Sequence, residues 1–425
     1  MLDLGLPLLV LAAATAGLVL GIEPIPSWYF QCAWWPYLFA ADGLNRRLSG
    51  RSLVRDRPRE LIWLSAASVA WWTLFEAINL RLGNWYYVMN HPSRAARWIG
   101  GALAFATVLP GILVTLGLVE SLTGSRPVRV APFRWSRSKE AGCLALGLGC
   151  LLLPLLWPDL FFPLTWGSFV FLIEPWNRRH ARESFLRDLE RGEAGPFCRT
   201  LVAGLVCGVL WESWNFWART RWIYTVPGFE ELKVFEMPLL GFLGFPPFAV
   251  QSVVAVRFLE TLRGRLAGWP PLRRGAGGVA AYVLGASATA LVFWWAEPVT
   301  TDSYHVPVAQ LRVLPASTRE RLAQLGLTTP ERLVAALEEP EGLRRWAKRA
   351  GVGEAELAAN LERVALVLHR GIGEERALQL ERLGIRSRED LARWQARELA
   401  AALWALEPDR PDPFLERRAR AWLGR

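Results

Sequence analysis

The sequence predicts an all-α protein, in which a polytopic helical membrane bundle is followed by a soluble helical domain. Long apolar runs recur as far as about residue 297, and the loops between them alternate between Arg-rich and Arg-poor. After about residue 303, charged residues alternate with Leu and Ala at helical spacing. The chain has 425 residues, of which 52% are hydrophobic, and a formal net charge of +10. A membrane protein with basic loops reconciles these values.

The apolar runs are near the length that a helix needs to cross a bilayer. The first run lacks a basic n-region and an obvious small-residue cleavage site, so we interpret it as a span and not as a signal peptide. The second, fifth and sixth runs are the shortest. The sequence predicts nine spans, at residues 4–22, 28–44, 61–80, 98–122, 141–157, 160–176, 200–217, 237–262 and 277–297.

The loop charges predict an orientation. Four loops are rich in Arg: 45–60, 123–140, 177–199 and 263–275. The intervening loops carry fewer basic residues and more aromatic ones. The positive-inside rule places the Arg-rich loops in the cytoplasm. Nine spans then place the N-terminus inside and the segment after residue 297 outside.

The sequence predicts that the membrane part consists of two copies of one repeat. Residues 30–54 align without gaps with residues 162–186, and the offset drifts from about 132 to 140 further along the chain. Each copy holds four spans, so both enter the membrane in the same orientation, as parallel repeats do. The matched pairs are Phe30/Phe162, Trp34/Trp166, Asp42/Glu174, Asn45/Asn177, Arg46/Arg178, Arg47/Arg179, Ser52/Ser184, Glu76/Glu212, Asn79/Asn215, Trp85/Trp222, Tyr87/Tyr224 and Glu120/Glu260.

The domain prediction follows from the repeats and from the change in composition. It places the first membrane repeat at 1–140 and the second at 141–276. A ninth span with a linker follows at 277–302, and the soluble domain occupies 303–425.

Two pairs of polar residues lie inside apolar runs. Glu76 and Asn79, like Glu212 and Asn215, are three residues apart and therefore share a helix face. A carboxylate in a span is costly and faces the bundle interior, a cavity or a partner. Two hypotheses remain: an intramembrane site that binds protons or substrate, or a hydrogen-bonded clamp between helices.

Aromatic residues and a further carboxylate follow these pairs. Trp85, Tyr87, Trp222 and Tyr224 are predicted to be anchors at the membrane interface rather than a stack on which substrate binds. Glu236 precedes a segment rich in Pro and Gly, which is either an outer loop before an ordinary helix or a broken segment that lines a cavity.

The remaining polar residues are predicted to be structural. Asp42 with Arg46, and Glu174 with Arg178, are four residues apart and are expected to form ion pairs. The five Cys lie in or beside apolar runs without a CxxC pattern, and the four His are scattered. The sequence therefore predicts no metal site and no cofactor.

The C-terminal segment contains a recognisable turn between helices. A helix leads into Gly371-Ile372-Gly373, and a second helix is followed by Leu383-Gly384-Ile385; residues 311–333 form a degenerate copy. This pattern resembles the tandem helix-hairpin-helix domain of a bacterial family of unassigned function. In DNA-binding members the hairpin holds a phosphate, but here two glutamates follow the hairpin directly. The membrane part resembles uncharacterised bacterial polytopic membrane proteins. This resemblance implies a location in the bacterial inner membrane, and the predicted orientation then places the C-terminal domain in the periplasm.

These features leave several functions open. The leading hypothesis is a membrane scaffold or assembly protein that contacts lipid and binds a protein partner, or itself, through the C-terminal domain. A transporter or channel that uses the Glu/Asn pairs is a second hypothesis. A membrane enzyme acting on a lipid or isoprenoid is a third, because the EMP string near Glu236 resembles the carotenoid cyclase group. Nucleic-acid binding remains the alternative for the C-terminal domain.

Overall fold

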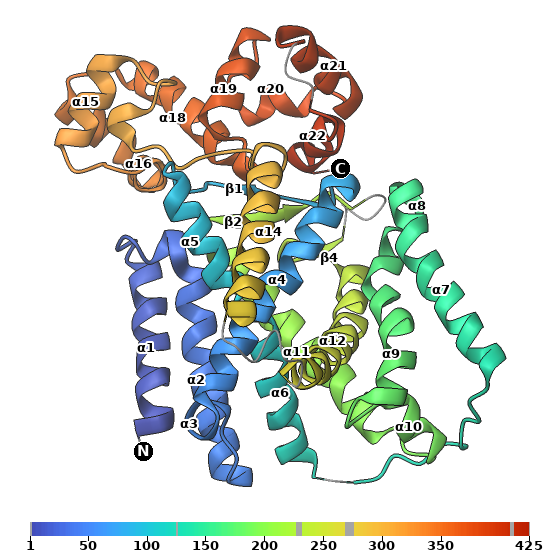
Figure 1. Ribbon diagram of the computed structural model, residues 1–425. Helices are drawn as coiled ribbons and strands as arrows, with labels where there is room; N and C mark the ends of the chain where they lie inside the picture. Colours follow the sequence, from blue (N-terminus) through green and yellow to red (C-terminus); the bar gives the residue numbers. More distant parts are fainter. Residues whose placement is uncertain (1, 125, 227–231, 268–275, 409–411, 425) are drawn as a thin grey trace. The chain divides into compact units, whose positions relative to one another are not determined.

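A computed structural model describes residues 2–124, 126–226, 232–267, 276–408 and 412–424 (Figure 1). The chain forms two compact units. The first comprises residues 1–82, 98–218 and 233–296, and the second comprises residues 83–97, 219–232 and 297–425. The Arg-rich loop predicted at 263–275 lies partly outside the described residues, as does the segment just before Lys233.

The first unit consists almost entirely of helices, which confirms the all-α prediction. In chain order these are α1 (Leu2–Val19), α2 (Tyr29–Ser49), α3 (Leu53–Asp56), α4 (Pro58–Leu82), α5 (Arg94–Phe105), α6 (Val108–Thr123), α7 (Arg137–Leu156), α8 (Pro158–Phe161), α9 (Ser168–His180), α10 (Phe185–Glu190), α11 (Gly195–Trp217), α12 (Phe245–Ala267) and α14 (Ala276–Thr300). Helices α1 and α2 lie side by side, as do α11 and α12 (Figure 1).

Among the residues that the structure describes, four helical segments are long and apolar enough to cross a membrane, and they overlap four of the predicted spans. These segments are Pro58–Leu82, Arg94–Thr123, Arg137–Leu156 and Leu239–Leu266. Residues 3–19 form a shorter apolar helix. The segment Arg94–Thr123 comprises α5 and α6, and residues 106 and 107 interrupt the α-helix between them.

Short polar motifs define where the small helices begin. The Ser52 side chain accepts a hydrogen bond from the backbone N–H of Arg55 at the start of α3. Ser184 does the same for Arg187 at the start of α10. These contacts satisfy N–H groups that have no partner within the helix. The Arg-rich loops 45–60 and 177–199 therefore each contain a capped helical turn.

The second unit contains a β-ribbon and the C-terminal helices. Strand β1 (Trp85–Val88) pairs antiparallel with β2 (Arg221–Tyr224). A second hairpin, β3 (Lys233–Val234) with β4 (Met237–Pro238), belongs to the first unit and leads into the 3₁₀ turn η3 (Leu239–Gly244). The C-terminal helices are α15 (Ala316–Gln324), α16 (Pro330–Glu338), α17 (Gly342–Ala350), α18 (Glu354–Leu368), α19 (Gly373–Arg382), α20 (Arg388–Ala392), α21 (Ala396–Leu406) and α22 (Leu415–Leu423).

The core of the second unit is built mainly from leucines of the C-terminal helices. Leu311, Leu322, Leu357, Leu380 and Leu399 are fully buried and belong to one cluster. A smaller cluster joins the ribbon to α22 through Tyr86, Val88, Ile223 and Ala421. The ribbon is therefore part of the folded C-terminal unit.

Candidate functional site

The two predicted Glu/Asn pairs are buried in the first unit. Glu76 and Asn79 lie near the end of α4 and are 3% and 0% exposed. Glu212 and Asn215 lie near the end of α11 and are both 0% exposed. The burial of two carboxylates in one helical unit carries a large desolvation cost, which polar contacts must offset.

Aromatic rings lie beside this polar region. The rings of Trp72 on α4 and Trp211 on α11 lie 5.2 Å apart, so these two side chains meet between the helices. Phe248 of α12 contacts both rings, at 5.8 and 6.3 Å. Trp72 Nε1 donates a hydrogen bond of 2.8 Å to Glu76 Oε1. The site can thus hold a polar group in a water-poor environment of aromatic rings.

Sequence reasoning missed one buried polar residue of this region. Gln251 lies one turn after Phe248 on α12 and is 0% exposed. Among the described residues, neither atom of its side-chain amide has a hydrogen-bond partner. A buried amide without a partner costs about 1–3 kcal/mol, so this one is a candidate contact for a ligand or water. Nothing in the sequence separates Gln251 from an ordinary helical glutamine.

Glu236 has a different environment from the four buried residues. It lies in the turn between β3 and β4 and is partly exposed. The Pro- and Gly-rich segment after it continues as η3 into α12, with Pro246 and Pro247 in the first turn of that helix. Proline is tolerated there because the first-turn N–H groups have no helical partner.

Asp42 and Glu174 do not contact the arginines that the sequence assigns to them. Asp42 accepts hydrogen bonds from Ser52 Oγ and from the backbone N–H of Leu53. Glu174 accepts equivalent bonds from Ser184 Oγ, at 2.8 Å, and from the N–H of Leu186, at 3.1 Å. Each carboxylate is buried under the helical turn that follows it, and N–H donors at that turn replace the expected ion pair.

The two arginines pair with other carboxylates. Arg46 Nη1 lies 2.6 Å from Asp3 Oδ2 of α1. Arg178 binds Glu190 through two nitrogens, each at 2.8 Å. Both arginines are partly exposed and therefore reach acidic groups at the surface, away from the buried carboxylates.

A large polar cavity lies at the Arg-rich end of the first unit. Its volume is about 1320 Å³. It is lined by residues from both halves of the sequence, among them Asn45, Arg51, Glu120, His180, Arg257 and Glu260. Arg257 Nη1 is buried without a hydrogen-bond partner among the described residues, although Nη2 lies 3.3 Å from Glu183.

The four predicted aromatic anchors face one another on the ribbon of the second unit. Trp85 pairs with Tyr224 and Tyr87 pairs with Trp222. The intervening residues Tyr86 and Ile223 are buried. Cross-strand aromatic pairs of this kind stabilise a short ribbon.

The hairpin glycines are covered by other parts of the second unit. Gly371 and Gly373 adopt positive φ angles of 73° and 71°. A Cβ at Gly371 would lie 2.3 Å from Val88, and one at Gly373 would lie 2.3 Å from Ser303. Ile372 between them is fully buried. The close approach that these glycines permit is to the chain itself.

The glutamate after the hairpin is also engaged. Glu374 is buried, and its Oε2 accepts a hydrogen bond of 2.9 Å from Arg312 Nε. The neighbouring Glu375 also pairs with Arg312. Glu374 and Glu375 raise the pKa of Arg312 by hydrogen bonding. These contacts join α19 to the segment before α15.

A buried ionic network, which sequence reasoning missed, holds the second unit together. Arg418 Nη1 lies 2.8 Å from Asp302 Oδ1 and 2.9 Å from Asp412 Oδ2. Its guanidinium also lies 5.2 Å from the ring centre of Tyr86 on β1. Burial lowers the pKa of Arg418, but the charges of Asp302 and Asp412 outweigh it and raise that pKa above its usual value. Arg418 therefore stays charged.

A second ion pair joins the segment just before β2 to helix α16. Arg219 Nε donates a hydrogen bond of 2.8 Å to Glu331 Oε1, and His305 Nε2 lies 3.6 Å from Glu331 Oε2. Burial alone would raise the pKa of Glu331; His305 and Arg219 outweigh it and lower that pKa to about 2. Among the residues that the structure describes, no group of His, Cys, Asp and Glu side chains could hold a metal ion.

The comparison with known proteins concerns the C-terminal helices. Residues 314–412 match a protein family described as a domain of unknown function (DUF4332). The match spans α15 to α21 and supports a C-terminal domain of unassigned function. No curated protein and no solved structure matches the chain.

Proposed function

We propose that this protein is a polytopic scaffold of the bacterial inner membrane, whose first unit is the membrane anchor and whose second unit binds a protein partner. The observation that carries this proposal is which segments of the chain form the second unit. Residues 83–97 and 219–232, which connect helices of the first unit, belong to the same compact unit as residues 297–425. The C-terminal helices therefore belong to one compact unit with two segments that connect helices of the first unit in the sequence.

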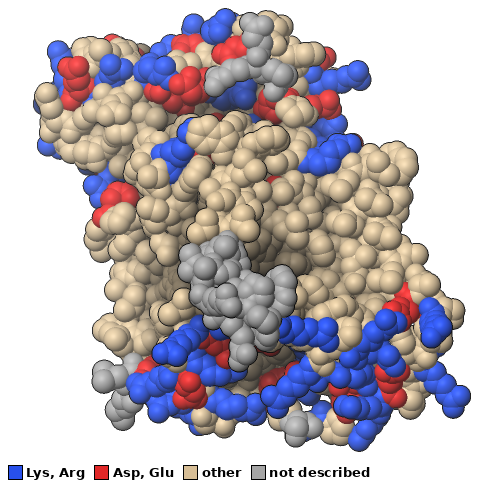
Figure 2. Space-filling model, viewed as in Figure 1, with Lys and Arg blue, Asp and Glu red and all other residues tan. Residues whose placement is uncertain are grey.

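The surface of the first unit supports a membrane location. Leucines on α1 and α7 are exposed, among them Leu9 at 66% and Leu156 at 59%. Figure 2 shows a broad band without charged residues, and Lys and Arg gather along the edge formed by the Arg-rich loops. A lipid-facing apolar band with a basic cytoplasmic edge accounts for both features.

Matched contacts support the duplication of the anchor. Asn45 Nδ2 donates to the Val114 carbonyl at 2.9 Å, and Asn177 Nδ2 donates to the Val254 carbonyl at 2.8 Å. The Asp42–Ser52 and Glu174–Ser184 bonds also occur at equivalent positions. In this proposal the buried Glu/Asn pairs form hydrogen bonds that lock the two repeats together.

The covered hairpin argues against nucleic-acid binding by the C-terminal domain. In a phosphate-binding hairpin, the glycines leave room for the ligand. Here Val88 and Ser303 occupy that room. A phosphate could reach this turn only if the ribbon left it.

The scaffold proposal is tested by site-specific photo-cross-linking in cells. Trp404 on α21 is 58% exposed, and Trp217 in the anchor is equally exposed, which makes it a matched control. A photoreactive residue at Trp404 should give discrete adducts with a second polypeptide, whereas one at Trp217 should react with lipid. Lipid adducts alone at both positions would refute partner binding through α21.

A transporter is the second candidate, because Gln251 and the polar cavity give it specific support. A buried amide without a partner and an Arg-rich cavity of about 1320 Å³ are features of a binding path. The double variant Glu76→Gln, Glu212→Gln separates the two candidates. The scaffold proposal predicts a lower melting temperature and unchanged ion flux in vesicles, whereas a transporter loses flux while it remains folded.

A further inference from the structure

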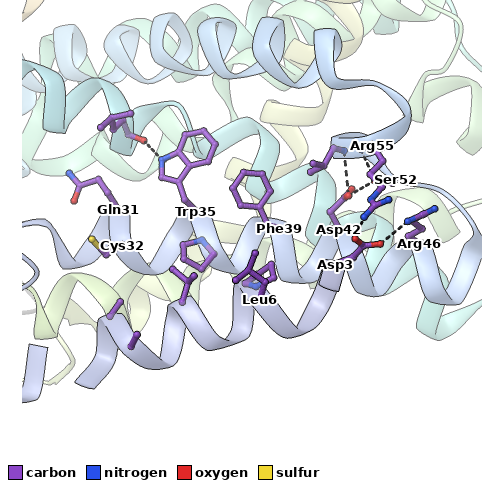
Figure 3. A pocket seen from close by; sticks show the side chains of 18 of the residues that line it. Asp3, Leu6, Gln31, Cys32, Trp35, Phe39, Asp42, Arg46, Ser52 and Arg55 are labelled. Carbon is purple, nitrogen blue, oxygen red and sulfur yellow. Dashed lines mark hydrogen bonds and ion pairs between the residues drawn. The ribbon is translucent and has the colours of Figure 1, made fainter. Parts of the chain in front are cut away.

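A groove runs along the outer surface of the first unit between α1 and α2 (Figure 3). Its volume is about 860 Å³, which lies within the range of small-molecule sites. Leu6, Val10, Trp35 and Phe39 line its length. Figure 3 shows Asp3, Asp42, Arg46, Ser52 and Arg55 gathered at one end.

The dimensions of the groove fit a lipid chain. Its lining on α2 extends from Gln31 to Arg46, which is about 22 Å at 1.5 Å per residue. The hydrocarbon core of a bilayer is about 30 Å thick, so the groove is longer than the half that one leaflet occupies. A chain that begins at the polar end can lie in the groove along its whole length.

The accessible charge at the polar end is basic. Asp3 pairs with both Arg46 and Arg55, whose side chains are 41% and 54% exposed. Asp42 is 4% exposed, and its oxygens accept bonds from Ser52 and Leu53. Two guanidiniums therefore share one accessible carboxylate, and this leaves positive charge at the surface of the groove.

We propose that this groove binds an anionic phospholipid, with its phosphate between Arg46 and Arg55 and one acyl chain against Trp35 and Phe39. The Arg-rich loop that supplies both arginines places the headgroup in the cytoplasmic leaflet, which carries anionic lipid. The proposal rests on the membrane location of the first unit. Sedimentation of the protein with membranes tests that location separately.

The test is native mass spectrometry of the full chain, released from nanodiscs that contain equal amounts of phosphatidylglycerol and phosphatidylcholine. The wild type should retain phosphatidylglycerol in preference to phosphatidylcholine. Arg46→Gln with Arg55→Gln should weaken that retention by roughly thirtyfold, from the attraction expected of two arginines near a headgroup. Arg47→Gln with Arg59→Gln changes the charge of the same loop by the same amount outside the groove and should have little effect.

Two further variants separate lipid binding from a disturbed fold. Asp3→Asn breaks the same ion pairs but leaves both arginines, so it should retain phosphatidylglycerol at least as well as the wild type. Ala13→Trp fills the groove without a change in charge and should lose the lipid, whereas Ala12→Trp, at an exposed position outside the groove, should keep it. Equal retention of both lipids by the wild type, or equal losses in the groove variants and their controls, would overturn the proposal.

Discussion

Asp302 Oδ1 accepts a hydrogen bond of 2.8 Å from Arg418 Nη1, and both side chains are buried. The two residues lie 116 positions apart, one just after α14 and the other on α22. Arg418 also donates to the carbonyl of Val299. This contact ties the last helix of the chain to the segment that follows the apolar part.

Arg418→Met should destabilise the second unit by about 3–5 kcal/mol, because it leaves the Asp302 carboxylate buried without its partner. Hydrogen exchange at the β1 amides of the full chain measures this loss as a lower free energy of opening. Arg420→Met provides the control, since Arg420 pairs with Glu416 at the surface, with 51% and 42% exposure. That variant should cost at most about 0.5 kcal/mol. Equal effects of the two variants would show that the buried Asp302–Arg418 pair contributes no more to stability than an ion pair at the surface.

The stability of the second unit should fall as the pH is lowered through the acid range. The pKa of Glu331 is about 2 in the folded protein, below its usual value of 4.5. A carboxyl whose pKa is depressed by folding stabilises the fold above its unfolded pKa, and that contribution is lost as the pH falls toward the folded value. The melting temperature should therefore drop between about pH 4.5 and pH 2.

The variant Glu331→Gln should flatten this pH dependence. Glu341, which is 69% exposed, serves as the control, and Glu341→Gln should leave the pH profile unchanged. If Glu331→Gln melts with the same pH profile as the wild type, the Arg219–Glu331–His305 contacts do not carry the effect.

Gly371→Ala should destabilise the second unit more than Gly384→Ala does. Both glycines have positive φ angles, of 73° and 80°, so each substitution strains the backbone by about 1–3 kcal/mol. Only at Gly371 would the new Cβ also meet Val88, whereas Gly384 faces open space. Chemical denaturation of the two variants gives the difference. Equal losses would mean that the ribbon does not pack on the hairpin in solution.

Gln251→Leu should stabilise the protein by about 1–3 kcal/mol if the buried amide has no partner, since leucine has a similar volume and no unsatisfied polar atoms. Asn45→Leu should destabilise it, because the Asn45 amide donates to the Val114 carbonyl. Thermal unfolding in detergent compares the two variants. A loss of stability in Gln251→Leu would show that a ligand or water satisfies the amide in the folded protein.

The helices could be predicted from the sequence because their apolar runs are local signals. Pro58–Leu82 and Arg137–Leu156 correspond to the runs predicted at 61–80 and 141–157. The burial of Glu76 and Glu212 also follows from their position inside such runs. These features need no information about distant parts of the chain.

The strands could not be predicted in the same way. Each strand of the ribbon has four residues, too few to form without a partner, and the partner lies more than 130 positions away. The sequence therefore favours membrane anchors for Trp85 and Tyr87, which lie on β1 in the structure.

The ionic contacts depend on chain reversals that local spacing does not reveal. Arg46 is one helical turn from Asp42, and the i, i+4 rule favours that pair. The capped turn at Ser52 instead brings N–H donors to Asp42, and α1 brings Asp3 to Arg46. The Asp302–Arg418 contact likewise has no local signal.

Residues 83–97, 219–232 and 297–425 form one compact unit, and we propose that this unit lies on the outer side of the membrane. The most direct test is labelling of single cysteines by a membrane-impermeant maleimide in spheroplasts, in a background without the five native Cys. The exposed positions Ser93 and Glu356 in the second unit, and Ser49 in an Arg-rich loop, are suitable sites. The account predicts labelling at Ser93→Cys and Glu356→Cys, and labelling at Ser49→Cys only after the membrane is permeabilised. Labelling of Ser93→Cys and Glu356→Cys from opposite sides of the membrane would contradict it.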